Sequence, residues 1–127
     1  MSNELYNRGV AKMAELDKET CDRLIETLQS VAPDFTKYVV EFAFGDVLSR
    51  PGLDVKTREL CTVSALTAMG TAPSQLRFHI GAARNVGCTR EEVLEAIMQM
   101  VLYAGFPAAL NALSAAKEVF DQEAAAK

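Results

Sequence analysis

The chain has 127 residues, of which 50% are hydrophobic and 24% charged, and its formal net charge is -4. This is the length of one ordinary domain, so the sequence predicts a single domain over residues 1–127. A nucleic-acid binder would show a basic patch, whereas the lysines and arginines here are scattered singly. The high apolar content predicts that other copies of the chain cover part of its surface.

The cysteines and the apolar runs indicate the compartment. The chain has three cysteines, Cys21, Cys61 and Cys88. Because their number is odd and no two are at CxxC spacing, neither a disulfide framework nor a zinc site is predicted. Free thiols of this kind are typical of a reducing compartment. The N-terminal segment lacks the apolar core of a signal peptide, and no apolar run approaches the roughly 20 residues that cross a bilayer. We therefore expect a cytoplasmic protein without a membrane partner.

Apolar residues recur at helical spacing along the first part of the chain. One helix is expected over residues 3–16 and a second over residues 18–31, with a break near Asp17. A third, strongly apolar helix is expected over about residues 33–47, because its proline suits a first helical position. The Pro-Gly turn within residues 49–53 ends this part of the chain.

The second part of the chain also has helical periodicity. Four helices are expected over residues 55–69, 73–85, 90–103 and 108–121. Gly70 and Gly87 end the first two, and Thr89 with Glu92 forms a capping box for the third. The tail from Gln122 is expected to fray. No stretch alternates with period two, so the predicted class is all-α, with about six to seven helices and a central antiparallel helical hairpin.

The only histidine, His79, lies in an apolar stretch of this hairpin, and Glu59 precedes it by twenty residues. The structural interpretation of His79 is a partly buried histidine that is hydrogen-bonded to the rest of the structure. The structural interpretation of Glu59 is a carboxylate that the helix dipole stabilises or that forms an ion pair with a neighbouring cation. The functional interpretation is an imidazole that gives and takes a proton near pH 7. The two helices of a hairpin can bring these residues together across the Gly70 turn.

Several segments from Phe44 onward resemble one protein family and occur in that family's order. They are residues 45–47 and 49–53, Lys56–Leu60, His79 with Ala82–Gly87, Thr89–Val93, and Tyr103–Ala109. Together they resemble the carboxymuconolactone decarboxylase family, which also contains the alkyl hydroperoxidase D proteins. The best-matching region is 44–121.

The resemblance implies an all-helical, alkyl hydroperoxidase D-like fold that assembles as a trimer or a hexamer, with pockets near subunit contacts. The hydroperoxidase branch carries a redox CxxC that ends four residues before its histidine. The matching residues here are Ala72–Gln75, which contain no thiol. Disulfide exchange needs an attacking thiolate and a resolving partner, so dithiol chemistry through that motif is excluded.

The activity that the resemblance implies is cofactor-independent decarboxylation of 4-carboxymuconolactone or a similar small anionic lactone, in the catabolism of aromatic compounds. His79 and Glu59 are the candidate catalytic residues: the histidine moves the proton, and the glutamate orients it or relays its proton. The decarboxylases of the family commonly carry a serine at the position of Glu59. No organic cofactor or metal is expected, because the lactone is its own electron sink.

Three further residues are candidate substrate ligands. A dicarboxylate calls for fork-shaped cations, for which Arg50 and Arg84 are candidates. The alternative is that both are solvated surface residues, as most surface arginines are. Tyr103 either donates its hydroxyl to a pocket or packs in the core.

Two other functions stay open from the sequence. The first is a hydroperoxidase-like or peroxiredoxin-like redox protein that uses Cys61 or Cys88 in place of the missing pair. The second is a non-catalytic helical oligomer that binds a small ligand.

Overall fold

A computed structural model describes residues 3–126, which contain helices and connecting turns and no strand. The predicted all-α class is confirmed. The chain divides into two compact units, Met1–Val55 and Lys56–Lys127, which are described separately below. Assignment of the whole chain to one domain stays a prediction.

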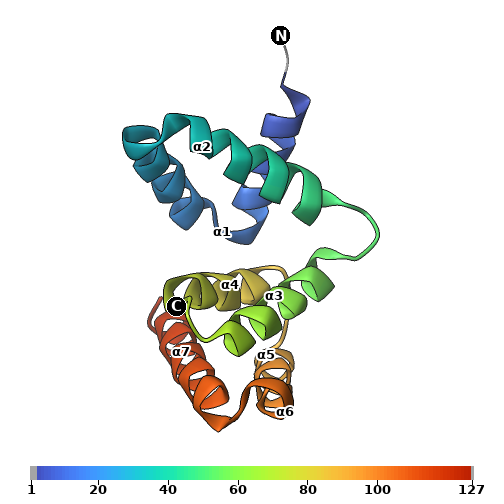
Figure 1. Cartoon of the computed structure of the whole chain (residues 1–127), viewed down its shortest axis with the longest axis vertical. Helices are drawn as coiled ribbons and strands as arrows, with labels where there is room; N and C mark the ends of the chain where they lie inside the picture. The colour runs from blue at the N-terminus through green and yellow to red at the C-terminus, as the bar shows by residue number, and fades with distance from the viewer. Residues whose placement is uncertain (1–2, 127) are drawn as a thin grey trace. The chain divides into compact units, whose positions relative to one another are not determined.

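The first unit begins with α1, Glu4–Val31, drawn in blue in Figure 1. The side chain of Asn3 caps it by accepting a hydrogen bond from the Tyr6 amide at 2.9 Å. The backbone of Asp17, at φ -169° and ψ 91°, interrupts the helix, and its carboxylate accepts the Thr20 amide at 3.1 Å. Asp17 therefore acts as the N-cap of a second helical segment, which confirms the two predicted helices and the break between them.

The remainder of the first unit is α2 (Pro33–Lys37), η1 (Tyr38–Asp46) and η2 (Val47–Ser49). The expected third helix is present, but the nine residues of η1 form a π-helix, which the apolar periodicity did not predict. α1 packs closely on η1 (Figure 1), and the Arg8 Nε atom donates to the Gly45 carbonyl at 2.7 Å.

The second unit consists of five helices. They are α3 (Val55–Met69, which starts one residue before the unit), α4 (Pro73–Asn85), α5 (Arg90–Gln99), α6 (Val101–Ala104) and α7 (Phe106–Ala125). Their shared core is apolar, with Val63 of α3, Ile80 of α4, Ile97 of α5 and Ala116 of α7 all fully buried. Only a short turn separates α3 from α4, and a side chain of α3 contacts a side chain of α4 across it.

Helix boundaries in the second unit follow most of the predicted signals. Gly70 and Gly87 have φ values of +69° and +103°, which favour glycine, and the Thr89–Glu92 capping box is present. The predicted helix 90–103 is divided at Met100 into α5 and α6.

The expectation that the tail frays from Gln122 is wrong, because α7 continues to Ala125. The carboxylate of Glu123 accepts a hydrogen bond from the Arg84 Nε atom at 2.9 Å and lies 3.5 Å from Arg90 Nη2. These ion pairs hold the last turns of α7 against the rest of the second unit.

Candidate active site

The hairpin of the second unit brings Glu59 and His79 into contact. Glu59 lies on α3 one turn before Val63 and two turns before Thr67, so all three share the buried face of the helix. His79 lies on α4 next to the fully buried Ile80. The Glu59 Oε1 and His79 Nδ1 atoms are 2.8 Å apart. The contact between these two candidate residues follows from packing of the two helices on one core.

The glutamate is the more buried member of the pair. The Glu59 side chain has 0% exposure, and that of His79 has 15%. The Glu59 Oε2 atom is buried and has no hydrogen-bond partner among the described residues. A buried carboxylate without a partner has a large desolvation cost. The contact with His79 offsets part of this cost when the glutamate is ionised.

This contact determines which histidine nitrogen is available for chemistry. An ionised carboxylate only accepts hydrogen bonds, so with Glu59 ionised the proton of this contact is on Nδ1. Nε2 is then the ring nitrogen that takes no part in the contact with Glu59. Among residues 3–126, no group of three or more histidine, cysteine, aspartate or glutamate side chains is arranged to hold a metal ion.

Arg84 joins two helices of the second unit. Its Nε atom donates to both carboxylate oxygens of Glu123, at 2.9 and 3.2 Å, and its Nη1 atom donates to the Cys88 carbonyl at 2.8 Å. Its guanidinium also lies over the Phe120 ring. Binding of substrate by Arg84 stays a prediction, although its Nε and Nη1 atoms already donate within the second unit.

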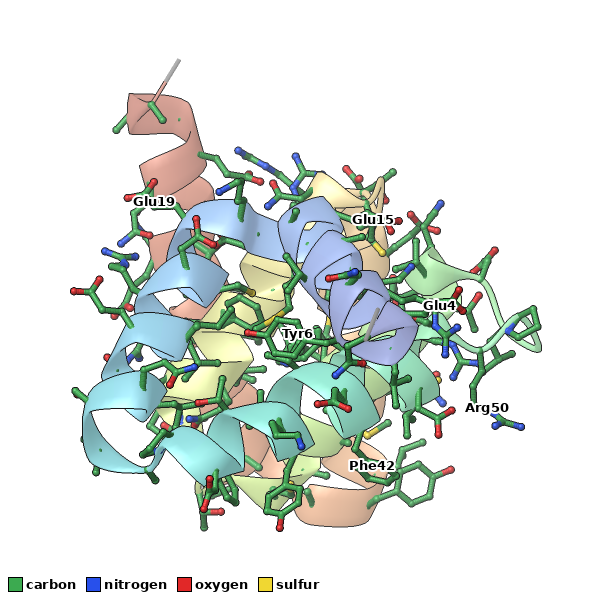
Figure 2. The ribbon with its side chains drawn as sticks, turned by 90° about the horizontal axis from the view of Figure 1, so that it is seen from above. Glu4, Tyr6, Glu15, Glu19, Phe42 and Arg50 are labelled. Carbon is green, nitrogen blue, oxygen red and sulfur yellow. The ribbon has the colours of Figure 1, made fainter. Side chains whose placement is uncertain are left out.

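Arg50 and Tyr103 are exposed. The Arg50 side chain, in the first unit, is 66% exposed and lies 3.7 Å from the Asp46 carboxylate; Figure 2 shows it projecting outward. Tyr103, on α6 of the second unit, is 75% exposed, so the alternative that it packs in the core is wrong. Roles for both as substrate ligands stay predictions.

Comparison with known proteins decides the family. The model of the carboxymuconolactone decarboxylase family matches residues 33–118. The chain belongs to the carboxymuconolactone decarboxylase family. This confirms the predicted family, and the chain is accordingly an enzyme of the decarboxylase type.

Three relatives support this membership. The 4-carboxymuconolactone decarboxylase of Acinetobacter baylyi is 40% identical over 116 residues, which cover 91% of this chain and 86% of the relative. A nitrosuccinic acid decarboxylase of Metarhizium robertsii is 30% identical over 117 residues, covering 88% and 81%. An uncharacterised 15.0 kDa protein of Paracoccus denitrificans is 36% identical over 100 residues, covering 78% and 75%.

The cysteines of this family member are separate thiols. None of the three is in a disulfide: Cys21 and Cys88 are buried, and Cys61 is exposed. Burial, and then the nearby Asp17 and Asp22 carboxylates, raise the pKa of Cys21 to about 12. Cys88 donates weakly to the Lys56 carbonyl. Use of these thiols in a redox reaction stays a prediction.

A cavity of about 270 Å³, which the sequence did not indicate, lies at the turn end of the α3–α4 hairpin. Its lining includes Leu66 of α3, Leu76 and Arg77 of α4, and Asn111 and Glu118 of α7, but neither Glu59 nor His79. Arg77 is two residues before His79, which places the two side chains roughly 200° apart around α4. This cavity is therefore separate from the histidine pair, and no sequence signal marked Arg77 as its lining.

None of the helices in residues 3–126 has the length and apolar character required to span a membrane. Oligomeric assembly and cellular location stay predictions.

Proposed function

We propose that this protein decarboxylates 4-carboxymuconolactone, or a closely similar small anionic lactone, with His79 as the group that moves the proton. The observation that carries the proposal is the 2.8 Å contact between His79 and the fully buried Glu59. The comparison that supports the substrate is the 40% identity to a 4-carboxymuconolactone decarboxylase over 91% of the chain.

The chemistry requires one proton and no external electrons. The bond between the ring carbon and its carboxylate breaks, and carbon dioxide leaves. The electron pair moves through the ring double bond onto the lactone carbonyl oxygen, which gives a dienolate. A proton is then delivered to the carbon next to that carbonyl, and the lactone carbonyl forms again. A hydrogen-bond donor beside the developing oxyanion lowers the barrier to the first step.

His79 is suited to the protonation step. With Nδ1 engaged by Glu59, its Nε2 atom is the one that delivers the proton to the dienolate. When both nitrogens carry protons, the imidazolium and the buried carboxylate form an ion pair, which holds the ring in one orientation. His79 is thus the proposed catalytic residue, and Glu59 is a positioning residue that acts through it.

The direct test is an ultraviolet assay of 4-carboxymuconolactone loss with wild type and His79→Gln. We expect kcat to fall by about 10²–10⁴, the usual contribution of a general acid or base. The far-ultraviolet circular dichroism of the variant should match wild type, because glutamine preserves a polar side chain at this half-buried position. Wild-type activity in His79→Gln would contradict the proposed role of His79.

A second variant separates this mechanism from the redox alternative. Cys61→Ser with Cys88→Ala removes the two thiols of the second unit, and lactone turnover should remain within about twofold of wild type, since no step of the proposed mechanism uses a thiol. Loss of a wild-type peroxide reductase activity in this double variant, with no lactone turnover in wild type, would favour the redox function instead.

A further inference from the structure

Short side chains on α7 leave the cavity of about 270 Å³ that lies against the start of α4. Ala108, Ala112 and Ala115 all line this cavity, and their spacing of four and three residues puts them on one face of α7. α7 packs on α4 through this face (Figure 1). One turn further along the same face, the larger Val119 reaches α4 at Gly81. The cavity therefore lies where alanines take the place of a larger residue.

The cavity combines an apolar floor with charged groups at its mouth. Leu76 and Ala115 are buried and form part of the floor. Arg77 and Glu118 line the cavity too, but their side chains are 41% and 58% exposed, which places them at the opening. Pockets for drug-sized ligands have volumes of about 300–1,000 Å³, so the occupant of this cavity is smaller than such a ligand.

The two charged residues at the mouth are close together but are not hydrogen-bonded to each other. The Arg77 Nε and Glu118 Oε2 atoms are 3.8 Å apart, which is longer than a hydrogen bond. An exposed ion pair of this kind contributes little to stability, so a ligand can separate it easily. The mouth thus presents a cationic donor and an anionic acceptor side by side.

This arrangement selects a ligand by its charges. A molecule with only a carboxylate is attracted by Arg77 but repelled by Glu118, and a molecule with only an ammonium group meets the reverse. A zwitterion with both groups pairs with both residues. An α-amino acid carries its carboxylate and its ammonium group on one carbon, and an aliphatic side chain on that carbon suits the apolar floor.

We propose that this cavity is a binding site for an aliphatic α-amino acid. The carboxylate pairs with Arg77, the ammonium group pairs with Glu118, and the side chain packs on Leu76 and Ala115. The site is separate from His79 and Glu59, neither of which lines the cavity. It does not depend on the proposed decarboxylation, because binding is measured without lactone.

The first test compares three probes by saturation-transfer difference NMR at pH 7. They are L-leucine, 4-methylpentanoate, which lacks the ammonium group, and 3-methylbutylamine, which lacks the carboxylate. We expect leucine to bind at least about fivefold more tightly than either of the others, because only leucine forms both charge-assisted contacts. Absence of leucine binding, or binding of a singly charged probe with equal or higher affinity, would overturn the proposal.

The second test locates the site with variants of the charged residues. Arg77→Gln and Glu118→Gln should each weaken leucine binding by at least about fivefold, since each removes one of the two charges. Both side chains are partly exposed, so the fold is retained, as circular dichroism would verify. Lys117→Gln is the matched control, because Lys117 is an exposed neighbour of Glu118 that does not line the cavity. Unchanged binding in both charge variants, or an equal loss in Lys117→Gln, would contradict this location.

The third test separates the cavity from the histidine pair. Ser114 lines the cavity and is exposed, so Ser114→Leu puts a larger side chain there without changing a charge or the core. We expect this variant to lose leucine binding while its circular dichroism matches wild type. His79→Gln should bind leucine as wild type does, whatever its effect on lactone turnover. Full binding in Ser114→Leu, or loss of binding in His79→Gln, would refute a second site in the cavity.

Discussion

Glu59 is the residue whose surroundings most constrain the chemistry. Its carboxylate is fully buried, one oxygen faces His79, and the other has no hydrogen-bond partner in the described part of the chain. Burial of a carboxylate costs desolvation free energy. An apolar residue of similar volume would avoid this cost, so stability alone does not explain a glutamate here. Glu59 is therefore better explained by its effect on His79 than by structural support.

Replacement of Glu59 by glutamine separates positioning from structure. Glutamine retains the shape and accepts the Nδ1 proton through its amide oxygen, but it lacks the charge that pairs with an imidazolium. We expect kcat to fall by roughly 10–10³ with KM changed less than about threefold, since the effect acts on the proton transfer rather than on binding. The measurement is the ultraviolet assay across pH 5 to 9. An unchanged kcat and pH profile in a folded Glu59→Gln variant would assign the residue a structural role.

Gly9 shows a different constraint on a single position, in the first unit. A Cβ atom there would lie 1.9 Å from the Val40 carbonyl oxygen, so α1 and η1 approach too closely for any other residue. The helix periodicity alone does not reveal this contact. From the sequence, a glycine inside a helix indicates only a low helix propensity.

We expect Gly9→Ala to lower the free energy of unfolding by about 3 kcal/mol, because the clash is with backbone and η1 must shift. Gly81 on α4 is the matched control: its Cβ would lie 3.9 Å from the nearest atom, Val119 Cγ1. Gly81→Ala should therefore raise the stability by about 0.5–1 kcal/mol through helix propensity. Urea denaturation of both variants checks this pair, and equal stability changes would show that the close approach of α1 and η1 is absent.

At the scale of elements, local signals set most helix ends and tertiary contacts set the others. The Asp17 break, the Gly70 turn and the capping box of α5 all follow from residues within a few positions. The last turns of α7 do not, because they depend on Arg84 and Arg90, which lie far away in the sequence.

The capping box makes the stability of α5 depend on pH. The Thr89 backbone N–H donates to the Glu92 carboxylate and, with smaller contributions such as that of Lys56, holds the pKa of Glu92 below its ordinary value of 4.5. A group with a lowered pKa in the folded state adds stability above its unfolded pKa and loses it as the pH falls through the folded value.

We therefore expect Glu92→Gln to be less stable than wild type at pH 7, and the difference to shrink below pH 4.5 as the wild-type carboxylate becomes protonated. Urea denaturation of both proteins at pH 7 and pH 3 measures the two differences. A gap that stays constant between these pH values would show that the charge of Glu92 makes no contribution to the cap.

At the scale of the whole molecule, the family is established but its members act on different compounds. One relative is named for 4-carboxymuconolactone and another for nitrosuccinic acid. The proposed substrate is the lactone, because the relative named for it shares 40% identity against 30% for the other.

This choice predicts a preference that steady-state kinetics can measure. We expect kcat/KM for 4-carboxymuconolactone to exceed that for nitrosuccinate by at least about tenfold, a discrimination that one or two pocket contacts supply. A reversed preference would retain decarboxylation through His79 but assign this chain to the nitrosuccinate type of activity.

The sequence by itself determined the all-α class, the family, and His79 and Glu59 as the residues to examine. Helical periodicity, glycine and proline positions and an N-cap act over a few residues, so they can be identified in the sequence without a tertiary structure. The ordered motifs of the family then selected the only histidine and the glutamate upstream of it.

Only the tertiary structure decided where the side chains of the candidate residues lie and what they contact. Burial of Glu59, engagement of Arg84 by Glu123 and exposure of Tyr103 all depend on residues distant in sequence. The same holds for the π-helix, which accompanies the close packing of α1 on η1. A residue type shows which chemistry is available, whereas packing determines whether its polar atoms face a partner, the core or solvent.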